Sequence, residues 1–212
     1  SAVSNVDKKF HEKTPYFCDP SILGRVGSGW RCKKGTRVSI MDLQALADQV
    51  DSVAIVGFFD LQGFSDWSET QQPREMLEFA IAQFHRTGRA IENAGGKQIK
   101  AIGDMGLFVF SADDPDRAVN ALRHMKRDCD LWLTEYGYPG TMAIRVQLGP
   151  ISCGMVGAAG REQFDLYGLA VNRAAMMRGG GIVLGPGLAE KFVEGSHFKL
   201  RKIGNDGFQV LD

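Results

Sequence analysis

Two aspartates could form a metal site, because each stands beside an apolar run that is typical of a buried strand. Asp60 directly follows VAIVGFF, residues 53–59. Asp104 lies in KQIKAIGDMGLFVFS, residues 97–111, which predicts two short strands joined by a tight turn at Gly103–Gly106. Either aspartate alone would be typical of an ordinary turn. Held rigidly side by side, the two carboxylates would suit one or two Mg²⁺ or Mn²⁺ ions on a triphosphate.

The segments around these aspartates alternate between strand and helix patterns from residue 51 onward. A helix is predicted to begin at Pro73 and to end at Gly95-Gly96. The order strand, helix, hairpin, helix, strand predicts an α/β fold, an α+β sandwich in which helices cover a ferredoxin-like mixed sheet. In such a sheet the first strand and the hairpin are neighbours, so Asp60 and Asp104 would converge at one end.

Two further expectations concern local structure. TMAIRVQLGP and SCGMVGA are predicted to be separate strands on either side of a turn at Gly149-Pro150. The helix that begins at Pro73 is predicted to bury one apolar face, which consists of Met76, Leu77, Ala80, Ile81, Phe84 and Ile91.

The N-terminal region differs from the rest of the chain. Residues 1–50 are predicted to form an irregular N-terminal arm that ends in a short lead-in helix over residues 39–50, and residues 51–212 form the main domain. LGRVGSGWRCK in the arm is similar to a glycine-rich phosphate loop. It lacks the Gly-Lys followed by Ser or Thr that such a loop needs, so an irregular arm is the favoured interpretation.

Composition excludes several classes of partner. The chain has 212 residues, and its 25 Lys and Arg balance its 25 Asp and Glu, which gives no reason to expect binding to nucleic acid or to an anionic membrane surface. No apolar run approaches the roughly 18 residues that span a bilayer. The polar N-terminus does not resemble a signal peptide, and four scattered cysteines favour neither a zinc site nor a disulfide framework. A cytoplasmic location is therefore predicted.

Three motifs, in order, resemble those of class III nucleotide cyclases. FFDLQGFSDWSE is similar to FxDIxGFTxxSE, and GGKQIKAIGDMGLFVF to GGxxxKxIGDxxLAxF. AIRVQLGPISCGMVGAAGREQFDLYGLAVNRAA is similar to RIGIHTGPVxxGxVGxxxRxxYDxxGxxVNxAAR. The resemblance runs from about residue 53 to about residue 211, roughly three quarters of the chain, and three ordered motifs are far more specific than one.

The resemblance implies a nucleotide cyclase, a lyase that converts a nucleoside triphosphate into its 3′,5′-cyclic monophosphate and pyrophosphate. Asp60 and Asp104 would bind two Mg²⁺ or Mn²⁺ ions per active site. The backbone of the loop after Asp60 would approach the triphosphate, with Leu61, Gln62, Gly63 and Phe64 as its members.

Other matched positions would bind the base, the ribose and the phosphates. Lys100 and Asp165 match a base-contacting pair that implies adenine, because a lysine donates to ring nitrogen N1 and a carboxylate accepts from the 6-amino group. Asn172 matches the asparagine that orients the ribose. Arg201 or Lys202 could supply a late phosphate-binding cation. The family's head-to-tail dimers further imply a homodimer with composite active sites.

One position departs from the family pattern. The transition-state arginine expected four residues after Asn172 is replaced by Met176. Three explanations are open: a slow enzyme, another cation in the arginine's role (Arg173, Arg161 or Lys202), or a site remodelled for a different nucleotide. Arg173 lies one residue after Asn172, and Arg178 lies two residues after Met176. Offsets of one or two residues turn a helical side chain by roughly 100° or 200°, so neither arginine is a simple replacement.

The substrate therefore has two candidate classes. The Lys100–Asp165 pair favours ATP. The expected absence of a sensor domain, together with Met176, favours the bacterial antiphage cyclases that make cyclic CMP or cyclic UMP, whose product would act on a cyclic-nucleotide-binding effector. A degenerate, non-catalytic nucleotide-binding module is a further alternative. A diguanylate cyclase is disfavoured, because the turn is IGDMG rather than GG(D/E)EF.

Overall fold

The computed structural model describes residues 23–26, 29–32, 52–192, 198–204 and 207–211. The chain divides into two compact units, residues 1–38 and 39–212. In the first unit, β1 (Leu23–Val26) and β2 (Gly29–Cys32) form an antiparallel hairpin within the predicted arm. The helix predicted over residues 39–50, and with it the boundary after residue 50, lies outside the described residues.

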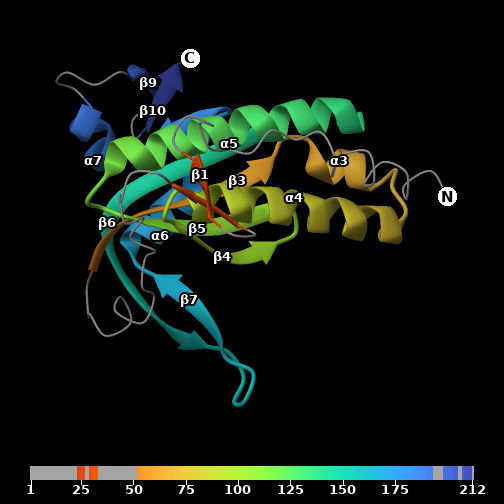
Figure 1. Cartoon of the computed structure of the whole chain (residues 1–212), viewed down its shortest axis with the longest axis horizontal. Coiled ribbons are helices and arrows are strands. Elements are labelled where there is room, and N and C mark those ends of the chain that lie inside the picture. The colour runs from red at the N-terminus through yellow and green to blue at the C-terminus, as the bar shows by residue number, and fades with distance from the viewer. Residues whose placement is uncertain (1–22, 27–28, 33–51, 193–197, 205–206, 212) are drawn as a thin grey trace. The chain divides into compact units, whose positions relative to one another are not determined.

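The second unit is a mixed, eight-stranded sheet with helices packed on it, as predicted (Figure 1). The strand order is β4-β5-β3-β6-β8-β10-β9, and β7 pairs with the far part of β6. All of these pairings are antiparallel except that of β6 with β8. The elements in chain order are β3 (Ser52–Leu61), α3 (Phe64–Ser68), α4 (Pro73–Asn93), β4 (Lys97–Ile102), β5 (Met105–Ser111), α5 (Pro115–Tyr136), β6 (Met142–Val156), β7 (Gln163–Tyr167), α6 (Leu169–Met176), β8 (Ile182–Leu184), α7 (Pro186–Ala189), the 3₁₀ turn η2 (Glu190–Phe192), β9 (Lys199–Ile203) and β10 (Gly207–Leu211).

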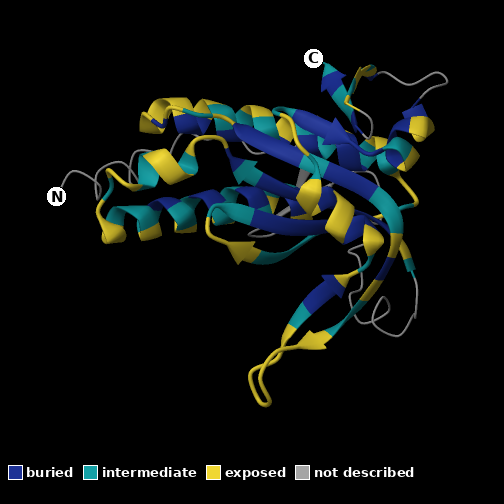
Figure 2. Cartoon of the chain, turned by 180° about the vertical axis from the view of Figure 1, so that it is seen from behind, coloured by how far each residue is buried: buried dark blue, intermediate teal, exposed yellow. Residues whose placement is uncertain are grey.

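Alternate residues of β3 belong to two apolar cores, one on each face of the sheet. Ile55 and Phe59 belong to the larger core, to which α4 and α5 contribute, and Val56 and Phe58 belong to the smaller core beneath α6. Seen from behind, the sheet strands are mostly buried (Figure 2). The last residues of β3, among them Asp60, are thus mounted on a strand that is packed on both faces.

The inward face of α4 differs from the predicted one. Leu77 and Ile81 are 61% and 47% exposed, whereas Gln83 and Thr87 are fully buried. The two polar side chains tolerate burial because each has a partner: Gln83 Nε2 donates to the Asp104 carbonyl at 2.8 Å, and Thr87 Oγ1 donates to Gln98 Oε1 at 2.8 Å. The predicted face was therefore wrong at Leu77 and Ile81, since apolar periodicity does not detect paired polar groups.

The turn predicted at Gly149-Pro150 is also absent. These residues continue β6, where they pair with β3. Pro150 is tolerated because β8 pairs only with the earlier residues 144–146, so one side of β6 has no pairing neighbour at that point. Beyond it, β6 and β7 form an arm that projects from the sheet (Figure 1). The sequence patterns did not predict β7.

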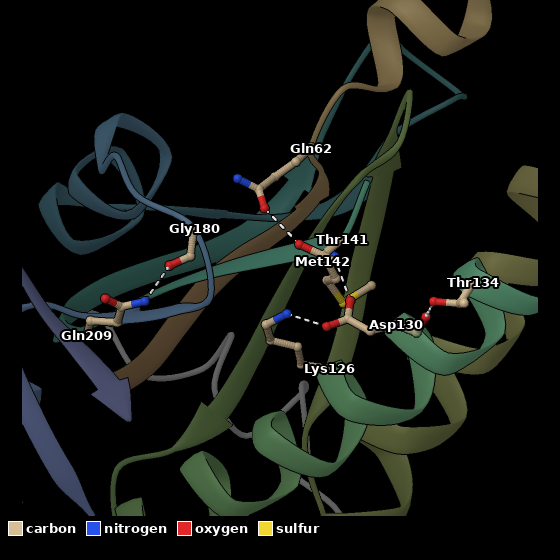
Figure 3. Close-up of polar contacts among 8 residues, drawn as sticks. All are labelled: Gln62, Lys126, Asp130, Thr134, Thr141, Met142, Gly180 and Gln209. Atoms are coloured by element: carbon tan, nitrogen blue, oxygen red, sulfur yellow. Dashed lines mark hydrogen bonds and ion pairs between the residues drawn. The ribbon is translucent and has the colours of Figure 1, made fainter. Parts of the chain in front are cut away.

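Hydrogen bonds fix the start of β6 against α5. Asp130 of α5 accepts the Met142 backbone N–H at 2.8 Å and pairs with Lys126 one helical turn earlier (Figure 3). Nearby Cys129 is a free, buried thiol, and burial raises its pKa to about 12. No helix in the described part of the chain combines the length and apolarity needed to cross a membrane.

Candidate active site

The sheet order brings the two predicted metal-binding aspartates together. β5 pairs with β3, so the β4–β5 turn that carries Asp104 lies beside the end of β3 that carries Asp60. The Leu61 backbone N–H donates to Asp104 Oδ2 at 2.8 Å and ties the two segments directly. Both aspartates open onto a pocket of about 360 Å³, which is lined by Asp60, Leu61, Gly63, Phe64, Ser65, Asp66, Ile102, Asp104 and Met105.

Asp104 is positioned from two sides. Gly103 adopts φ 63°, a left-handed conformation that glycine accepts readily, and this makes the turn tight. The buried Gln83 of α4 holds the Asp104 carbonyl, and Leu61 holds the side chain. Burial raises the pKa of the Asp104 carboxyl; backbone N–H groups of Leu61 and of Asp104 itself oppose the rise, and the nearby charge of Asp60 adds to it.

Asp60 is held by a residue that the sequence reasoning missed. Arg145 of β6 donates through Nη1 to Asp60 Oδ2 at 2.5 Å. Arg145 is paired across the sheet with Phe58, two residues before Asp60, so both charged side chains lie on the face beneath α6. The sequence does single out Arg145, because it is the one charged residue of the strand MAIRVQLGPISCGMV.

The remaining oxygens of this pair fit a divalent cation. Asp60 Oδ1 is buried and accepts no hydrogen bond, which is costly for a carboxylate oxygen unless a cation completes it. The donors are carboxylate oxygens, the type that Mg²⁺ and Mn²⁺ prefer. Among the described residues, no cluster of three or more His, Cys, Asp or Glu could hold a metal. Water or substrate phosphate would therefore complete the coordination of an ion held by Asp60 and Asp104.

The loop after Asp60 faces the pocket with three of its four predicted members. Leu61, Gly63 and Phe64 line the pocket, and Gly63 adopts φ 79° at the start of α3. Gln62 instead anchors the loop. Its N–H donates to the Thr141 carbonyl at 3.0 Å, and its carbonyl accepts from Tyr138 Oη at 2.9 Å. Its side chain accepts from Thr141 Oγ1 at 2.8 Å (Figure 3).

The predicted base-binding pair is also brought together. Lys100 of β4 and Asp165 of β7 form an ion pair, with 2.6 Å between Nζ and Oδ2. Asp165 is only 9% exposed, and its Oδ1 accepts the Leu166 N–H at 2.8 Å. A buried carboxylate with two donors is firmly oriented, and each of its oxygens retains a lone pair for a ligand.

The remaining predicted residues do not reach the aspartates within the described chain. Asn172, Arg173 and Met176 lie on the exposed face of α6, and Met176 is 67% exposed. Arg201 and Lys202 are exposed on β9, at the opposite edge of the sheet from β4. Arg201 donates to Gln209 Oε1 at 2.6 Å, and Gln209 in turn donates to the Gly180 carbonyl (Figure 3).

Comparison with known proteins identifies the same family as the three sequence motifs. The family model described as the adenylate and guanylate cyclase catalytic domain matches residues 46–184. An adenylate cyclase of Anabaena cylindrica is 30% identical over 130 residues, which are 58% of this chain and 26% of that protein. The chain thus spans about a quarter of the length of this curated relative.

Solved structures share the fold. The adenylyl cyclase CyaB from P. aeruginosa has a TM-score of 0.67 and 18% identity, over 76% of this chain and 95% of that one. The guanylate cyclase domain of RhGC from Catenaria anguillulae, in complex with GTP, has a TM-score of 0.66 and 19% identity, over 75% and 96% of the two chains. At these identities the likeness concerns the fold.

Proposed function

The chain belongs to the family of adenylate and guanylate cyclase catalytic domains, and we propose that residues 51–212 convert a nucleoside triphosphate into its 3′,5′-cyclic monophosphate. The reaction forms a bond between the ribose 3′-oxygen and the α-phosphorus and breaks the α–β phosphoanhydride bond, releasing pyrophosphate and a proton. The observation that carries the proposal is the convergence of Asp60 and Asp104 on one pocket.

In this proposal the two aspartates hold divalent metal at the pocket. Bound metal would lower the pKa of the 3′-hydroxyl and neutralise charge on the phosphates. Leu61, Gly63 and Phe64 line the same pocket and would contact the triphosphate. The hydrogen bonds of Gln62 keep this loop in place, so that the phosphates meet a rigid surface.

We propose ATP as the substrate. Lys100 Nζ would donate to adenine N1, and Asp165 would accept from the 6-amino group. Their 2.6 Å ion pair supports this assignment, because it holds the donor and the acceptor side by side before a base arrives. Guanine presents the reverse order of donor and acceptor on the matching edge, so the same placement would disfavour it.

A pyrimidine triphosphate is the second candidate. Cytosine presents an acceptor at N3 beside a 4-amino donor, the same order as adenine, so the Lys100–Asp165 pair does not separate the two bases. Met176 in place of an arginine is the observation that favours a remodelled site. Uracil presents the reverse order, so we place CTP before UTP. Cyclic CMP would then act on a separate effector protein that binds cyclic nucleotides.

We also propose that two chains form a homodimer with composite sites. In the described residues no hydrogen bond or ion pair joins Asn172 or Arg173 to either aspartate, so these α6 side chains are available to a partner's pocket. Large apolar residues are exposed nearby on β6, β7 and α6, and contact with a second chain would bury them. They are Met155, Val156, Tyr167, Leu169 and Met176.

The test offers ATP, GTP, CTP and UTP separately to the purified chain with Mn²⁺ and identifies the products by mass spectrometry. We expect cyclic AMP from ATP. Asp60→Asn and Asp104→Asn should each lower the rate about 100-fold or more, since each removes a charged metal ligand. Asp116→Asn, an exposed change at the start of α5, is the matched control and should leave the rate unchanged.

Each alternative has its own result in this assay. Cyclic CMP as the main product would support the second candidate. Full activity of either metal-site variant would contradict the role given to the aspartates. A wild-type chain that makes no cyclic product from any of the four nucleotides would overturn the proposal in favour of a non-catalytic binding module.

A further inference from the structure

Arg145 places a positive charge against Asp60, one of the aspartates that line the pocket. Its side chain is only 15% exposed and lies on β6, between β3 and β8 in the middle of the sheet. A charged residue in a central strand costs desolvation, so its partner is informative. That partner is Asp60, and the 2.5 Å contact involves the carboxylate expected to bind metal.

The contact between Arg145 and Asp60 reduces the number of carboxylate lone pairs that can bind metal. The resemblance to class III cyclases implies two ions per site, and both would draw on Asp60 and Asp104. The Arg145 guanidinium takes one lone pair of Asp60 Oδ2, and the Leu61 N–H takes one lone pair of Asp104 Oδ2. Asp60 Oδ1 remains buried and without a hydrogen-bond partner. No third acidic or histidine side chain joins the pair within the described ranges.

Electrostatic repulsion also disfavours a second metal ion beside Asp60. A guanidinium carries a positive charge, so Arg145 repels a divalent ion that approaches Asp60 Oδ2. Its Nη2 makes only a long 3.5 Å bond to the Gly179 carbonyl, and its buried Nε–H donates to no partner. The guanidinium therefore keeps donors that could bind an anionic oxygen.

We propose that Arg145 takes the place of the second metal ion, so that each site binds a single divalent ion through Asp60 Oδ1 and Asp104. The guanidinium supplies the second positive charge that the triphosphate meets. It also provides a cation in a site that has Met176 where the family pattern has an arginine. This inference rests on the proposed cyclase function and concerns how its metal site is built.

The experiment counts bound Mn²⁺ per chain by electron paramagnetic resonance, with Mn²⁺ alone and with Mn²⁺ plus the α,β-methylene analogue of ATP. Two Mn²⁺ ions in one site would lie about 4 Å apart and show spin coupling. We expect wild type to bind one uncoupled ion under both conditions. Arg145→Gln keeps the approximate size of the side chain and removes its charge, so it should bind a second, coupled ion with the analogue.

Two further variants control this result. Arg145→Lys retains a positive charge and should bind one ion, like wild type. Arg74→Gln removes the same charge from an exposed pair with Glu78 on α4 and should also leave the count at one. Arg145→Gln is used only if circular dichroism shows that it is folded. If it is not, the numbers of Mn²⁺ ions bound by wild type and by Arg145→Lys still test the inference, because each should be one.

Two coupled ions in wild type with the analogue would overturn the inference, and so would a count of one in folded Arg145→Gln. Cyclase activity in the four-nucleotide assay would stand in either case, so the two failures are distinguishable. A wild-type chain that binds no Mn²⁺ under either condition would overturn both this inference and the metal-dependent function.

Discussion

At the scale of single residues, the two aspartates of the pocket have different surroundings. Asp60 is paired with a guanidinium, whereas Asp104 is held by a backbone N–H and has a raised pKa. A proton on Asp104 would compete with the proposed metal, whereas Asp60 shares one of its oxygens with the Arg145 guanidinium. The two carboxylates are therefore not interchangeable, and Asp60 is the one whose role depends on another side chain.

Lys100 carries the first prediction at this scale. Lys100→Met should lower kcat/KM for ATP about 10- to 100-fold, since a charged hydrogen bond to the base is lost. Mn²⁺ binding should not change, because Lys100 is not among the residues that line the metal pocket. Steady-state kinetics with all four nucleotides provide the measurement.

The matched control is Lys97→Met, three residues earlier on β4, where the lysine pairs with Glu92 at 3.8 Å. That variant should keep wild-type kinetics. An equal loss of kcat/KM for every nucleotide in Lys100→Met would argue that Lys100 supports the fold rather than reading the base.

At the scale of elements, the loop after β3 depends on the connection between α5 and β6. Tyr138 and Thr141, which both lie in that connection, hold Gln62 by its backbone and its side chain. Tyr138 also packs against Trp67 of α3 and Phe79 of α4, with ring centroids 5.2 and 5.7 Å away. The loop after β3, which we propose contacts the triphosphate, is therefore held by several elements at once.

Tyr138→Phe removes the hydroxyl that donates to the Gln62 carbonyl and keeps the aromatic ring. The lost hydrogen bond to the Gln62 carbonyl should lower the free energy of unfolding by about 1 kcal/mol. It should also raise KM for the nucleotide, because the loop is held less firmly. Urea unfolding and steady-state kinetics measure the two effects. Tyr136→Phe, in the same aromatic cluster, is the control; equal effects in both variants would contradict the anchoring role.

The same tyrosine predicts a pH dependence. Burial, with added repulsion from Asp104 and Asp60, raises the pKa of Tyr138 to about 12. The folded chain thus keeps a proton that the unfolded chain loses from about pH 10. Its contribution to stability is complete below about pH 10 and is lost as the pH rises toward 12. Between these values the unfolding free energy of wild type should fall more steeply than that of Tyr138→Phe; parallel curves would contradict this.

At the scale of the whole molecule, the proposed active site is shared between two chains. Asp60→Asn and Asn172→Ala should each be inactive alone, because every site of either homodimer lacks one group. Mixed one to one, they should regain about a quarter of wild-type activity, since half of the random dimers are mixed and each of these has one intact site. Product formation after mixing measures this; no recovery, with dimers shown by light scattering, would contradict composite sites.

The type and order of most elements of the main domain could be predicted from the sequence. β3, α4, the β4–β5 hairpin and α5 follow from apolar periodicity and from turn and cap residues, which act within a few positions of the chain. The same local patterns failed for the inward face of α4, where buried polar residues pair with distant groups, and at Pro150, where the missing strand neighbour removes the penalty.

By itself, the sequence determined the fold class and identified Asp60, Asp104, Lys100 and Asp165 as candidates, because motif residues and their order can be read along one dimension. Only the tertiary structure decided the contacts. Asp60 and Arg145 are 85 residues apart, and they meet because β6 lies beside β3 in the sheet. Strand order is a property of the whole packed chain, so the strand pattern that singles out Arg145 could not show that its guanidinium contacts Asp60.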